Sequence, residues 1–457
     1  MNVPAAIFRQ YDIRGLVDLE LTPALARRIG RALVAVARER GARAPRLAVG
    51  RDNRPSGTAL AEAVAQGIAS AGAHAIDVGL VPTPALYFAV HALGVDGGVQ
   101  VTGSHNPPEF NGFKMLAGGA TVHGDDIQRM RVLIEQDDGR ETAGGVTVDD
   151  TVLSGYEDAI AERNAPLARA VKVVVDCGNG VTSLVAERLL SRIGADVTPL
   201  FCESDGRFPN HHPDPTVPEN LADLVAAVRR TGAELGIAFD GDGDRIGAVD
   251  EDGKIIWGDQ LLILFGRDLV ARMGTGHPVI FDVKCSDVLV QELRRVGLVP
   301  TLWKTGHSLI KAKMKELNAP LAGEMSGHIF FAGDYFGFDD ALFAAARLLA
   351  FMAREGGPLS THLADLPKTF ATPEIRIDCP DEVKFAVVEE AAREFAKRHE
   401  VLTLDGARIT FPNGWGLLRA SNTQPVLVMR FEAASEEDLA RYREEVEGWL
   451  RDRGIAV

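Results

Sequence analysis

The chain has 457 residues, of which 46% are hydrophobic and 25% are charged, which is the composition of a folded globular protein and excludes a largely disordered one. The length predicts three or four domains, and the formal net charge of −15 argues against binding nucleic acid by bulk charge. We expect no signal peptide, because the N-terminal segment has charged residues and no uninterrupted apolar run. No apolar stretch is long enough to span a membrane, and the four cysteines include no C-x-x-C pair. We therefore expect a soluble, cytoplasmic protein without a zinc knuckle or a disulfide framework.

Helix and strand patterns alternate along most of the chain. A first helix is predicted over 22–40, with Thr22 as its N-cap and Pro23 in its first turn. Three similar strand–turn–helix units then begin near residues 46, 172 and 278. Such units are typical of α/β domains with parallel strands, whose carboxyl ends collect ligands. We therefore predict three similar α/β domains with mixed sheets, and one continuous doubly wound sheet is the alternative.

The C-terminal part of the chain has a different pattern. Short strands are predicted at 374–377, 402–404, 407–411 and 426–431, with helices over 382–398 and from Ser435 to Arg451. This order is typical of a smaller α+β domain. Boundaries placed in segments rich in Gly, Asp and Pro divide the chain into predicted domains over 1–150, 151–254, 255–369 and 370–457.

The strongest chemical signal is a row of three aspartates that alternate with glycines. Asp240, Asp242 and Asp244 directly follow the apolar strand predicted over 235–239. Glycine lets the chain curl so that three carboxylates converge, and converging carboxylate oxygens suit Mg²⁺. An EF-hand is one alternative, although Arg245 stands where that loop needs glycine, and a solvated acidic turn is another. We expect Arg245 to donate to a phosphate that the metal also contacts.

A second signal is Ser104, in the polar turn 102–107 that follows the short apolar run 98–101. The turn is not a nucleophile elbow, because the residues two before and two after the serine are Thr and Asn instead of glycine. A serine in such a turn is expected to be exposed and rigidly presented, and the adjacent His105 could hydrogen-bond a group held on it. A turn that only caps the next element is the alternative.

Two further turns carry groups that recognise sugars and phosphates. The glycine-bounded turn 323–328 offers a carboxylate, a hydroxyl and an imidazole, which suit sugar hydroxyls. The turn 419–425 combines an arginine, hydroxyls, an amide and backbone N–H groups, which suit a phosphate dianion. For each turn, a plain loop with satisfied polar groups is the alternative.

Together and in this order, Thr-Gly-Ser-His-Asn-Pro, Asp-Gly-Asp-Gly-Asp-Arg, Gly-Glu-Met-Ser-Gly-His and Arg-Ala-Ser-Asn-Thr resemble the α-D-phosphohexomutase superfamily, in particular its bacterial phosphomannomutase/phosphoglucomutase branch. The resemblance implies four domains around a central cleft. It implies an isomerase that interconverts hexose 1-phosphate and hexose 6-phosphate, of mannose or glucose, through a phosphoserine and a hexose 1,6-bisphosphate. Mg²⁺ would be its cofactor and hexose 1,6-bisphosphate its activator. A phosphosugar would be its partner, without nucleic acid or membrane, in a monomer or weak homo-oligomer.

The resemblance also implies roles for individual residues. Ser104 would carry the phosphoryl group and would bind the metal together with Asp240, Asp242 and Asp244. The groups expected to take part in catalysis are Ser104, His105, Arg14, Lys114, Arg245, Lys284 and His307. The groups expected to bind substrate are Tyr11, Glu324, Ser326, His328, Arg419, Ser421, Asn422 and Thr423. A bisphosphate ligand requires local positive charge. Although the chain has a net negative charge, these segments contain five cationic side chains: Arg14, Lys114, Arg245, Lys284 and Arg419.

Three other functions stay open on the sequence. A phosphoglucosamine mutase is the nearest of them, although that branch usually has Gln at the position of Met325. A metal-dependent sugar phosphatase would pass the phosphoryl group from Ser104 to water. A sugar-phosphate sensor would keep the site without catalysis.

Overall fold

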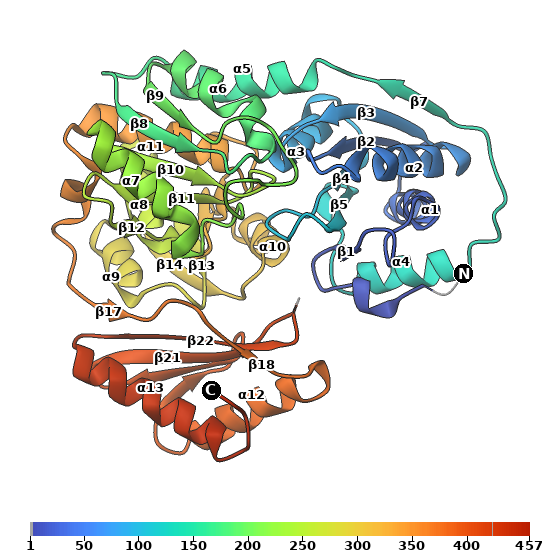
Figure 1. Cartoon of the computed structure of the whole chain (residues 1–457). Coiled ribbons are helices and arrows are strands. Elements are labelled where there is room, and N and C mark those ends of the chain that lie inside the picture. The colour runs from blue at the N-terminus through green and yellow to red at the C-terminus, as the bar shows by residue number, and fades with distance from the viewer. Residues whose placement is uncertain (1–2, 423) are drawn as a thin grey trace.

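The computed structural model describes residues 3–422 and 424–457, which are arranged as four domains (Figure 1). Domain I, in blue, lies on the right of Figure 1, and domain IV, in red, lies at the bottom. Domain I comprises η1 (Ala5–Ile7), β1 (Ile13–Leu16), α1 (Pro23–Glu39), β2 (Arg46–Arg51), α2 (Gly57–Ser70), β3 (His74–Leu80), α3 (Thr83–Ala92), β4 (Gly97–Val101), β5 (Phe110–Ala117), β6 (Ala120–Thr121), α4 (Asp125–Glu135) and β7 (Gly145–Val148). Its strands form one sheet in the order β1-β5-β4-β2-β3-β7, with β6 paired to β5. Thr22 Oγ1 accepts from the backbone N–H of Leu25 at 3.3 Å, which confirms the predicted N-cap of α1.

Domain II contains the second sheet, in the order β12-β11-β10-β8-β9. Its elements are α5 (Val152–Asn164), β8 (Lys172–Asp176), η2 (Val181–Leu184), α6 (Ala186–Ile193), β9 (Asp196–Leu200), η3 (Pro218–Leu221), α7 (Ala222–Thr231), β10 (Leu235–Phe239), β11 (Ile246–Asp250) and β12 (Ile255–Ile256).

Domain III contains the third sheet, in the order β14-β13-β15-β16. Its elements are α8 (Gly258–Met273), β13 (Pro278–Asp282), α9 (Asp287–Arg295), β14 (Val299–Trp303), α10 (His307–Leu317), β15 (Leu321–Gly323), β16 (Ile329–Phe331), α11 (Ala341–Glu355) and η4 (Leu359–Leu363).

These three sheets share one core topology. In each, a first strand (β2, β8 or β13) lies between a second strand (β3, β9 or β14) and a third (β4, β10 or β15), and all three are parallel. A fourth strand (β5, β11 or β16) is antiparallel to the third. The prediction of three similar α/β domains with mixed sheets is confirmed, and the alternative of one continuous sheet is wrong. The repeated starts in the sequence coincide with the first strand of each sheet.

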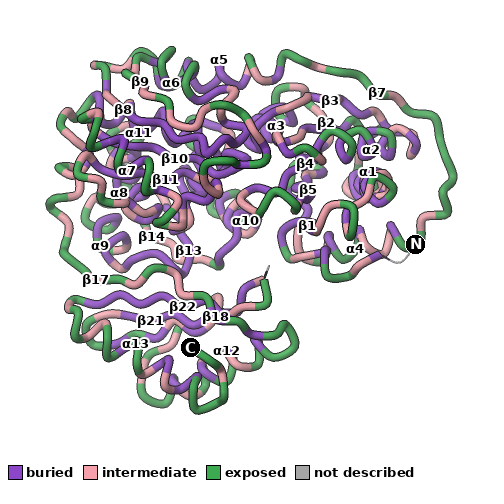
Figure 2. Tube along the Cα trace, in the orientation of Figure 1, coloured by how far each residue is buried: buried purple, intermediate pink, exposed green. Residues whose placement is uncertain are grey.

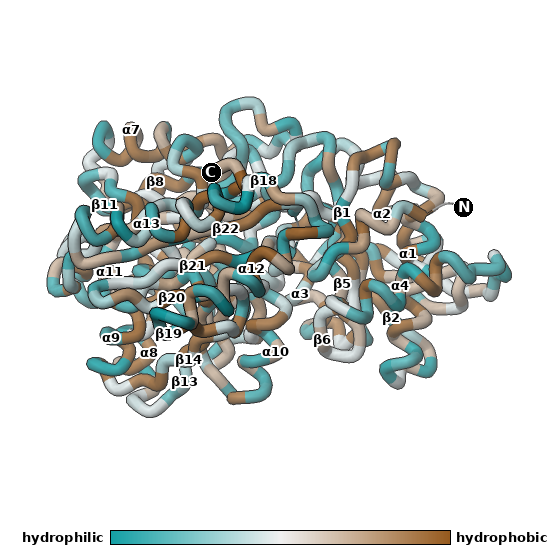
Figure 3. The backbone as a smooth tube through the Cα atoms, turned by 90° about the horizontal axis from the view of Figure 1, so that it is seen from below, coloured by the Kyte–Doolittle hydropathy of each residue, from teal (hydrophilic) through white to brown (hydrophobic). Residues whose placement is uncertain are grey.

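Domain IV is a sheet in the order β17-β22-β21-β20-β19, with β18 also paired to β22 and every pairing antiparallel. Its elements are β17 (Phe370–Ala371), β18 (Ile375–Asp378), α12 (Asp381–Phe395), β19 (Glu400–Leu402), β20 (Ala407–Phe411), β21 (Gly414–Ala420), β22 (Val426–Ala433) and α13 (Glu436–Arg451). Figure 3, which views the molecule from below, shows the apolar residues of β22 across this domain.

Three strands of domain IV differ from the prediction. The strand expected at 402–404 lies at Glu400–Leu402, and β17 and β21 are not among the predicted strands. Glycine is uncommon inside strands, and β21 contains two. The structure gives one of them a packing role, because a Cβ at Gly416 would lie 2.7 Å from the ring of Phe431 on the neighbouring strand.

One large apolar core joins domains II and III and reaches α3 of domain I, whereas domain IV has a core of its own. The apolar helix α11 packs against α5, α8 and β11 and is buried over most of its length (Figure 2). No helix in the described part of the chain is long and apolar enough to cross a membrane.

Candidate active site

Three of the predicted motifs occupy equivalent places in three domains. The loop 102–109 joins β4 to β5, the loop 240–245 joins β10 to β11, and the loop 324–328 joins β15 to β16. Each loop therefore connects the third strand of its sheet to the antiparallel fourth strand, and each starts at the carboxyl edge of the parallel strands. The fourth motif is the turn between β21 and β22.

Ser104 of domain I lies against the acidic loop of domain II. Its Oγ donates to Asp240 Oδ2 at 2.7 Å, and the Nδ1 atom of His105 lies 3.1 Å from the same Oγ. The serine is 1% exposed instead of exposed as expected, because domain II covers it. Its φ of +48° is in the left-handed region, which costs energy in a residue other than glycine. A turn that only capped the next element would not require this strain or this contact between domains.

Sequence analysis missed the buried ion pair that holds the serine loop, Asp52–Arg54. Arg54 Nε donates to Asp52 Oδ2 at 3.2 Å, and Thr102 Oγ1 donates to the same oxygen at 2.7 Å. The two terminal nitrogens of Arg54 donate to four backbone carbonyls, those of Ser104 at 2.7 Å, Asn106 at 2.5 Å, Pro107 at 2.5 Å and Phe110 at 2.9 Å. The available signal was the charged turn directly after the first repeated strand.

We expect Arg54→Ala to lower the free energy of unfolding by about 3–5 kcal/mol, because it leaves the buried Asp52 carboxylate without its cation. Urea unfolding followed by circular dichroism measures this change. Arg51→Ala is the matched control: Arg51 lies 3.9 Å from Asp77 at a partly exposed site, and its loss should cost under about 1 kcal/mol. Equal stabilities for the two variants would contradict the role given to Arg54.

The acidic loop curls around one carboxylate, as its glycines predicted. Asp240 Oδ1 accepts backbone N–H groups from Gly243 at 3.0 Å, Asp244 at 3.1 Å and Arg245 at 3.1 Å. Gly243 has a φ of +80°, which favours glycine. The flanking elements are the strands β10 and β11 and the three aspartates are fully buried, so the EF-hand and the solvated turn are both wrong.

The three aspartates fit a divalent cation. One oxygen from each of Asp240, Asp242 and Asp244 lies within 4.8 Å of the others. Among the described residues, Oδ1 of Asp242 and Oδ1 of Asp244 are buried and accept no hydrogen bond. A buried carboxylate oxygen without a partner is unfavourable, and a hard cation such as Mg²⁺ would satisfy it. Burial, reinforced by the charges of Asp242 and Asp244, raises the pKa of Asp240 well above its ordinary value.

Lys114 of β5 supplies positive charge to the same loop. Its Nζ donates to Asp242 Oδ2 at 2.7 Å and to Asp244 Oδ2 at 2.5 Å. Burial lowers the pKa of Lys114, but the two carboxylates outweigh burial and raise it. Burial likewise raises the pKa of Asp242, and here the charge of Lys114 prevails and brings it below its ordinary value. The ammonium therefore stays charged beside the serine loop.

The imidazole of His328 is oriented by its neighbours. Arg245 Nε donates to His328 Nε2 at 2.9 Å, and since a guanidinium can only donate, the proton of a neutral His328 is on Nδ1. That Nδ1 lies 3.1 Å from Asp339 Oδ2 and 3.6 Å from Asp244 Oδ1. Both ring nitrogens thus face protein groups in this conformation, and the expected contact of His328 with sugar stays a prediction.

Asp339 is a second site residue that sequence analysis missed. It accepts from Lys311 Nζ at 2.9 Å, and its other oxygen lies 3.5 Å from His307 Nδ1. The rings of His307 and His328 stack with centroids 5.6 Å apart. Burial and the charge of Lys311 lower the pKa of His307 well below its ordinary value, so this imidazole is neutral. The signal was the pair of aspartates directly before α11.

Contacts of Tyr11 join domains I, III and IV. Its hydroxyl donates to the carbonyl of Thr305 at 2.7 Å and accepts from Asn422 Nδ2 at 3.0 Å. Gly306 follows Thr305 with a φ of +127°, and a Cβ there would lie 2.5 Å from the tyrosine ring. Arg14, on β1, donates from Nη1 to Asn106 Oδ1 at 3.1 Å and thus reaches the serine loop.

The sugar and phosphate motifs lie near the boundary between domains III and IV. Glu324 Oε1 accepts from the backbone N–H of Gly306 at 3.0 Å, and its Oε2 accepts from Ser326 Oγ at 3.3 Å. Lys284 Nζ lies 3.3 Å from Glu374 Oε2, and Arg419 Nε lies 3.2 Å from Asp405 Oδ2.

The remaining expected phosphate ligands are in the β21–β22 turn. Ser421 Oγ accepts from the backbone N–H of Gln424 at 3.1 Å. Thr423 lies outside the described residues, so its expected role stays a prediction.

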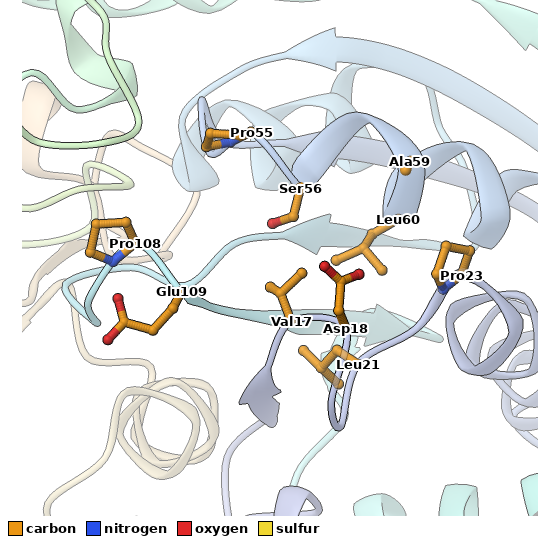
Figure 4. A pocket seen from close by; sticks show the side chains of 10 residues that line it. All are labelled: Val17, Asp18, Leu21, Pro23, Pro55, Ser56, Ala59, Leu60, Pro108 and Glu109. Carbon is orange, nitrogen blue, oxygen red and sulfur yellow. The ribbon is translucent and has the colours of Figure 1, made fainter.

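A cavity of about 470 Å³ lies elsewhere on domain I, beside the far end of the serine loop (Figure 4). Its walls carry two carboxylates and no cation, so it does not suit a phosphosugar. The lining residues are Val17, Asp18, Leu21, Pro23, Pro55, Ser56, Ala59, Leu60, Pro108 and Glu109.

Comparison with known proteins gives consistent matches along the chain. Four family models match it in order: the phosphoglucomutase/phosphomannomutase alpha/beta/alpha domain I over 5–141, domain II over 154–253 and domain III over 257–370, and the C-terminal domain over 374–448. A phosphomannomutase/phosphoglucomutase of Pseudomonas aeruginosa is 49% identical over 97% of this chain and 95% of its own length. A phosphoglucomutase of Neisseria gonorrhoeae is 46% identical over 96% of this chain and 95% of its own. The crystal structure of a phosphoglucomutase/phosphomannomutase family protein from Burkholderia thailandensis matches with a TM-score of 0.91 at 44% identity, over 99% of this chain and 98% of that one.

Proposed function

The chain belongs to the phosphoglucomutase/phosphomannomutase family, and from that premise we propose that it is a phosphohexomutase that uses Ser104 to carry the phosphoryl group. It is an isomerase that interconverts hexose 1-phosphate and hexose 6-phosphate. The observation that supports this role of Ser104 is its contact with Asp240 of the acidic loop. Among the described residues, Ser104 is also the only serine with a positive φ.

The proposed reaction transfers one phosphoryl group in each direction. The bond between phosphorus and Oγ of phosphorylated Ser104 breaks, a new bond forms to the free hydroxyl of the bound hexose phosphate, and a hexose 1,6-bisphosphate results. After this intermediate has turned end for end, its other phosphate returns to Ser104. Asp240, Asp242 and Asp244 would hold Mg²⁺, whose charge would offset the negative charge on the transferred oxygens.

We assign different roles to the cationic side chains and to the histidines of the site. Lys114, Arg14 and Arg245 present cations to the transferred group. Lys284 is held as a cation, since the charges of Glu374 and Asp282 outweigh the lowering effect of burial and raise its pKa. It therefore suits placement of the substrate. His307 is the candidate for accepting a proton from the attacking hydroxyl. His105, whose Nδ1 lies 3.1 Å from Ser104 Oγ, would position the phosphoserine.

The remaining predicted residues would hold the far end of the substrate. Glu324 and Ser326 suit the sugar hydroxyls that both substrates share, and the β21–β22 turn with Arg419 suits the phosphate that is not being transferred. In this structure the guanidinium of Arg419 forms an ion pair with the Asp405 carboxylate, so a bound phosphate would compete with Asp405 for Arg419.

We expect Arg419→Ala to raise KM for glucose 1-phosphate about 10- to 100-fold with a smaller change in kcat, because it removes a charge-assisted contact present in both ground and transition states. Steady-state kinetics with a fixed trace of glucose 1,6-bisphosphate measure the two parameters. Arg441→Ala, which removes an exposed arginine of the same domain, is the control. A loss confined to kcat would count against a role in substrate binding.

An assay with several hexose phosphates would determine which sugar the enzyme prefers. Met325, which distinguishes this chain from the usual glucosamine branch, is buried in the apolar core. Rates with glucose, mannose and glucosamine 1-phosphates would rank the three substrates. Release of inorganic phosphate without formation of the isomer would indicate a phosphatase instead, and absence of any phosphoryl transfer would indicate a sensor.

A further inference from the structure

Two thiols from neighbouring strands meet in domain II. Cys177 directly follows β8, and Cys202 lies two residues beyond the end of β9, which runs parallel to β8. Their Sγ atoms are 3.0 Å apart and share a hydrogen bond. Both residues are free cysteines, and a disulfide bond would bring the sulfurs about 1 Å closer, to about 2.05 Å.

The backbone around both thiols holds them in this position. The N–H of Cys177 donates to the carbonyl of Leu200 at 3.1 Å, and the N–H of Asn179 donates to the carbonyl of Phe201 at 2.9 Å. Asn179 and Phe201 have φ values of +59° and +49°, which are costly for residues other than glycine. Such strain persists only where the surrounding structure imposes it. The backbone of the two segments that carry Cys177 and Cys202 therefore holds the two sulfurs close together.

The two thiols differ in access and in acidity. Cys177 is fully buried, whereas Cys202 is only partly buried. The hydrogen bond between the two thiols lowers the pKa of Cys202, and the same bond together with burial raises the pKa of Cys177 well above its ordinary value. Since the thiolate is the attacking species in thiol–disulfide exchange, Cys202 is the thiol that meets a reagent first.

We propose that Cys177 and Cys202 form an oxidation site, at which a small-molecule disulfide converts the two thiols into an intramolecular disulfide bond. The Cys202 thiolate attacks one sulfur of the reagent, so that a mixed disulfide forms and the first reagent thiolate leaves. The Cys177 thiolate then attacks the Cys202 sulfur, so that the bond between the two cysteines forms and the second reagent thiolate leaves. The protein thiols lose two electrons to the reagent disulfide, and their two protons end on the two reagent thiols.

The new bond would brace a segment that supports the metal-binding loop. The N–H of Val181 donates to the carbonyl of Gly241 at 3.1 Å, and a Cβ at Gly180 would lie 2.9 Å from that carbonyl oxygen. Asn53 of domain I donates to the carbonyl of Asn179 at 2.7 Å. Because Cys202 is the less tightly packed partner, we expect its side of the pair to move and the 177–181 segment to stay in place. Oxidation should then stabilise domain II and leave mutase activity intact.

The test uses the full chain, first reduced and then equilibrated with oxidised glutathione. We expect a Cys177–Cys202 cross-linked peptide in a non-reducing digest, a loss of two hydrogen atoms in intact mass, and a rise in Tm of several degrees that dithiothreitol reverses. Mutase activity should stay within about twofold of that of the reduced protein. The buried Cys379 offers a matched control, since Cys379→Ser should behave as the unaltered chain does.

Two variants separate the steps. Cys202→Ser should form no cross-link and show no shift in Tm, whereas Cys177→Ser should stop at a glutathione adduct on Cys202. A stable glutathione adduct on Cys202 of the unaltered chain, a cross-link between other cysteines, or full retention of both thiols under conditions that oxidise dithiothreitol would overturn the proposal. A loss of activity on oxidation that Cys202→Ser prevents would overturn the expected direction of movement. If Cys177→Ser fails to fold, the peptide map of the unaltered chain still decides between a cross-link and an adduct.

Discussion

Ser104→Ala is expected to abolish turnover, with kcat at least about 10⁴-fold below that of the unaltered protein. The hydroxyl proposed to accept and return the phosphoryl group is absent from this variant, and the neighbouring groups proposed to bind substrate and metal are unchanged. His105 and Asp240 contact the Ser104 hydroxyl but neither replaces it as the carrier. The measurement is formation of glucose 6-phosphate from glucose 1-phosphate in the presence of Mg²⁺ and a trace of glucose 1,6-bisphosphate.

The matched control is Ser154→Ala, which removes an exposed hydroxyl on α5 that donates to the backbone carbonyl of Thr151. It should leave kcat unchanged. Intact mass after incubation with glucose 1,6-bisphosphate should show a phosphoryl group on the control and none on Ser104→Ala. Substantial turnover by Ser104→Ala would mean that another residue carries the group, and the proposed mechanism would fail.

Asp242→Asn is expected to lower kcat by about 10³-fold, which corresponds to about 4 kcal/mol of lost transition-state stabilisation. The substitution removes one charge from a set of three carboxylates that suits Mg²⁺. It also removes one of the two carboxylates that pair with Lys114. A chelator should abolish the activity of the unaltered protein, and added Mg²⁺ should restore it.

Stability must be measured beside activity, because Lys114 is buried and loses a partner in this variant. Thermal unfolding identifies a variant that has simply unfolded. Asp205→Asn is the control: Asp205 contacts the exposed Arg207, and its loss should change neither kcat nor the dependence on Mg²⁺. Unchanged activity of the unaltered protein in excess chelator would contradict a metal at Asp240, Asp242 and Asp244.

The loops that carry Ser104, the three aspartates and Glu324 lie at equivalent positions in domains I, II and III. Each of these loops follows the third parallel strand of its sheet, so the repeated topology presents a polar loop at the same edge of each sheet. The contacts that join them are side-chain contacts between domains: Ser104 with Asp240, and Arg245 with His328. Substitutions at these pairs should therefore disturb the relative placement of two domains as well as the chemistry of one loop.

By itself the sequence determined the local features of this protein. The N-cap at Thr22, the three repeated strands and the curl of the aspartate loop all follow from short-range preferences of proline, β-branched residues and glycine, which act within a few positions along the chain. The family resemblance could be stated for the same reason, since each of its motifs is a short continuous run. The strand β21 was missed where this logic fails, because Gly416 is set by a ring from a neighbouring strand.

Only the tertiary structure decided which groups meet. Arg54 lies 50 residues from Ser104, whose carbonyl it contacts, and Asp339 lies 28 residues from Lys311, with which it pairs. A sequence pattern does not indicate either buried contact. The same holds for Cys177 and Cys202, which the sequence places 25 residues apart and the parallel pairing of β8 with β9 brings to 3.0 Å. Contacts of this kind depend on how several elements pack at once, and packing is a property of the whole fold rather than of any one segment.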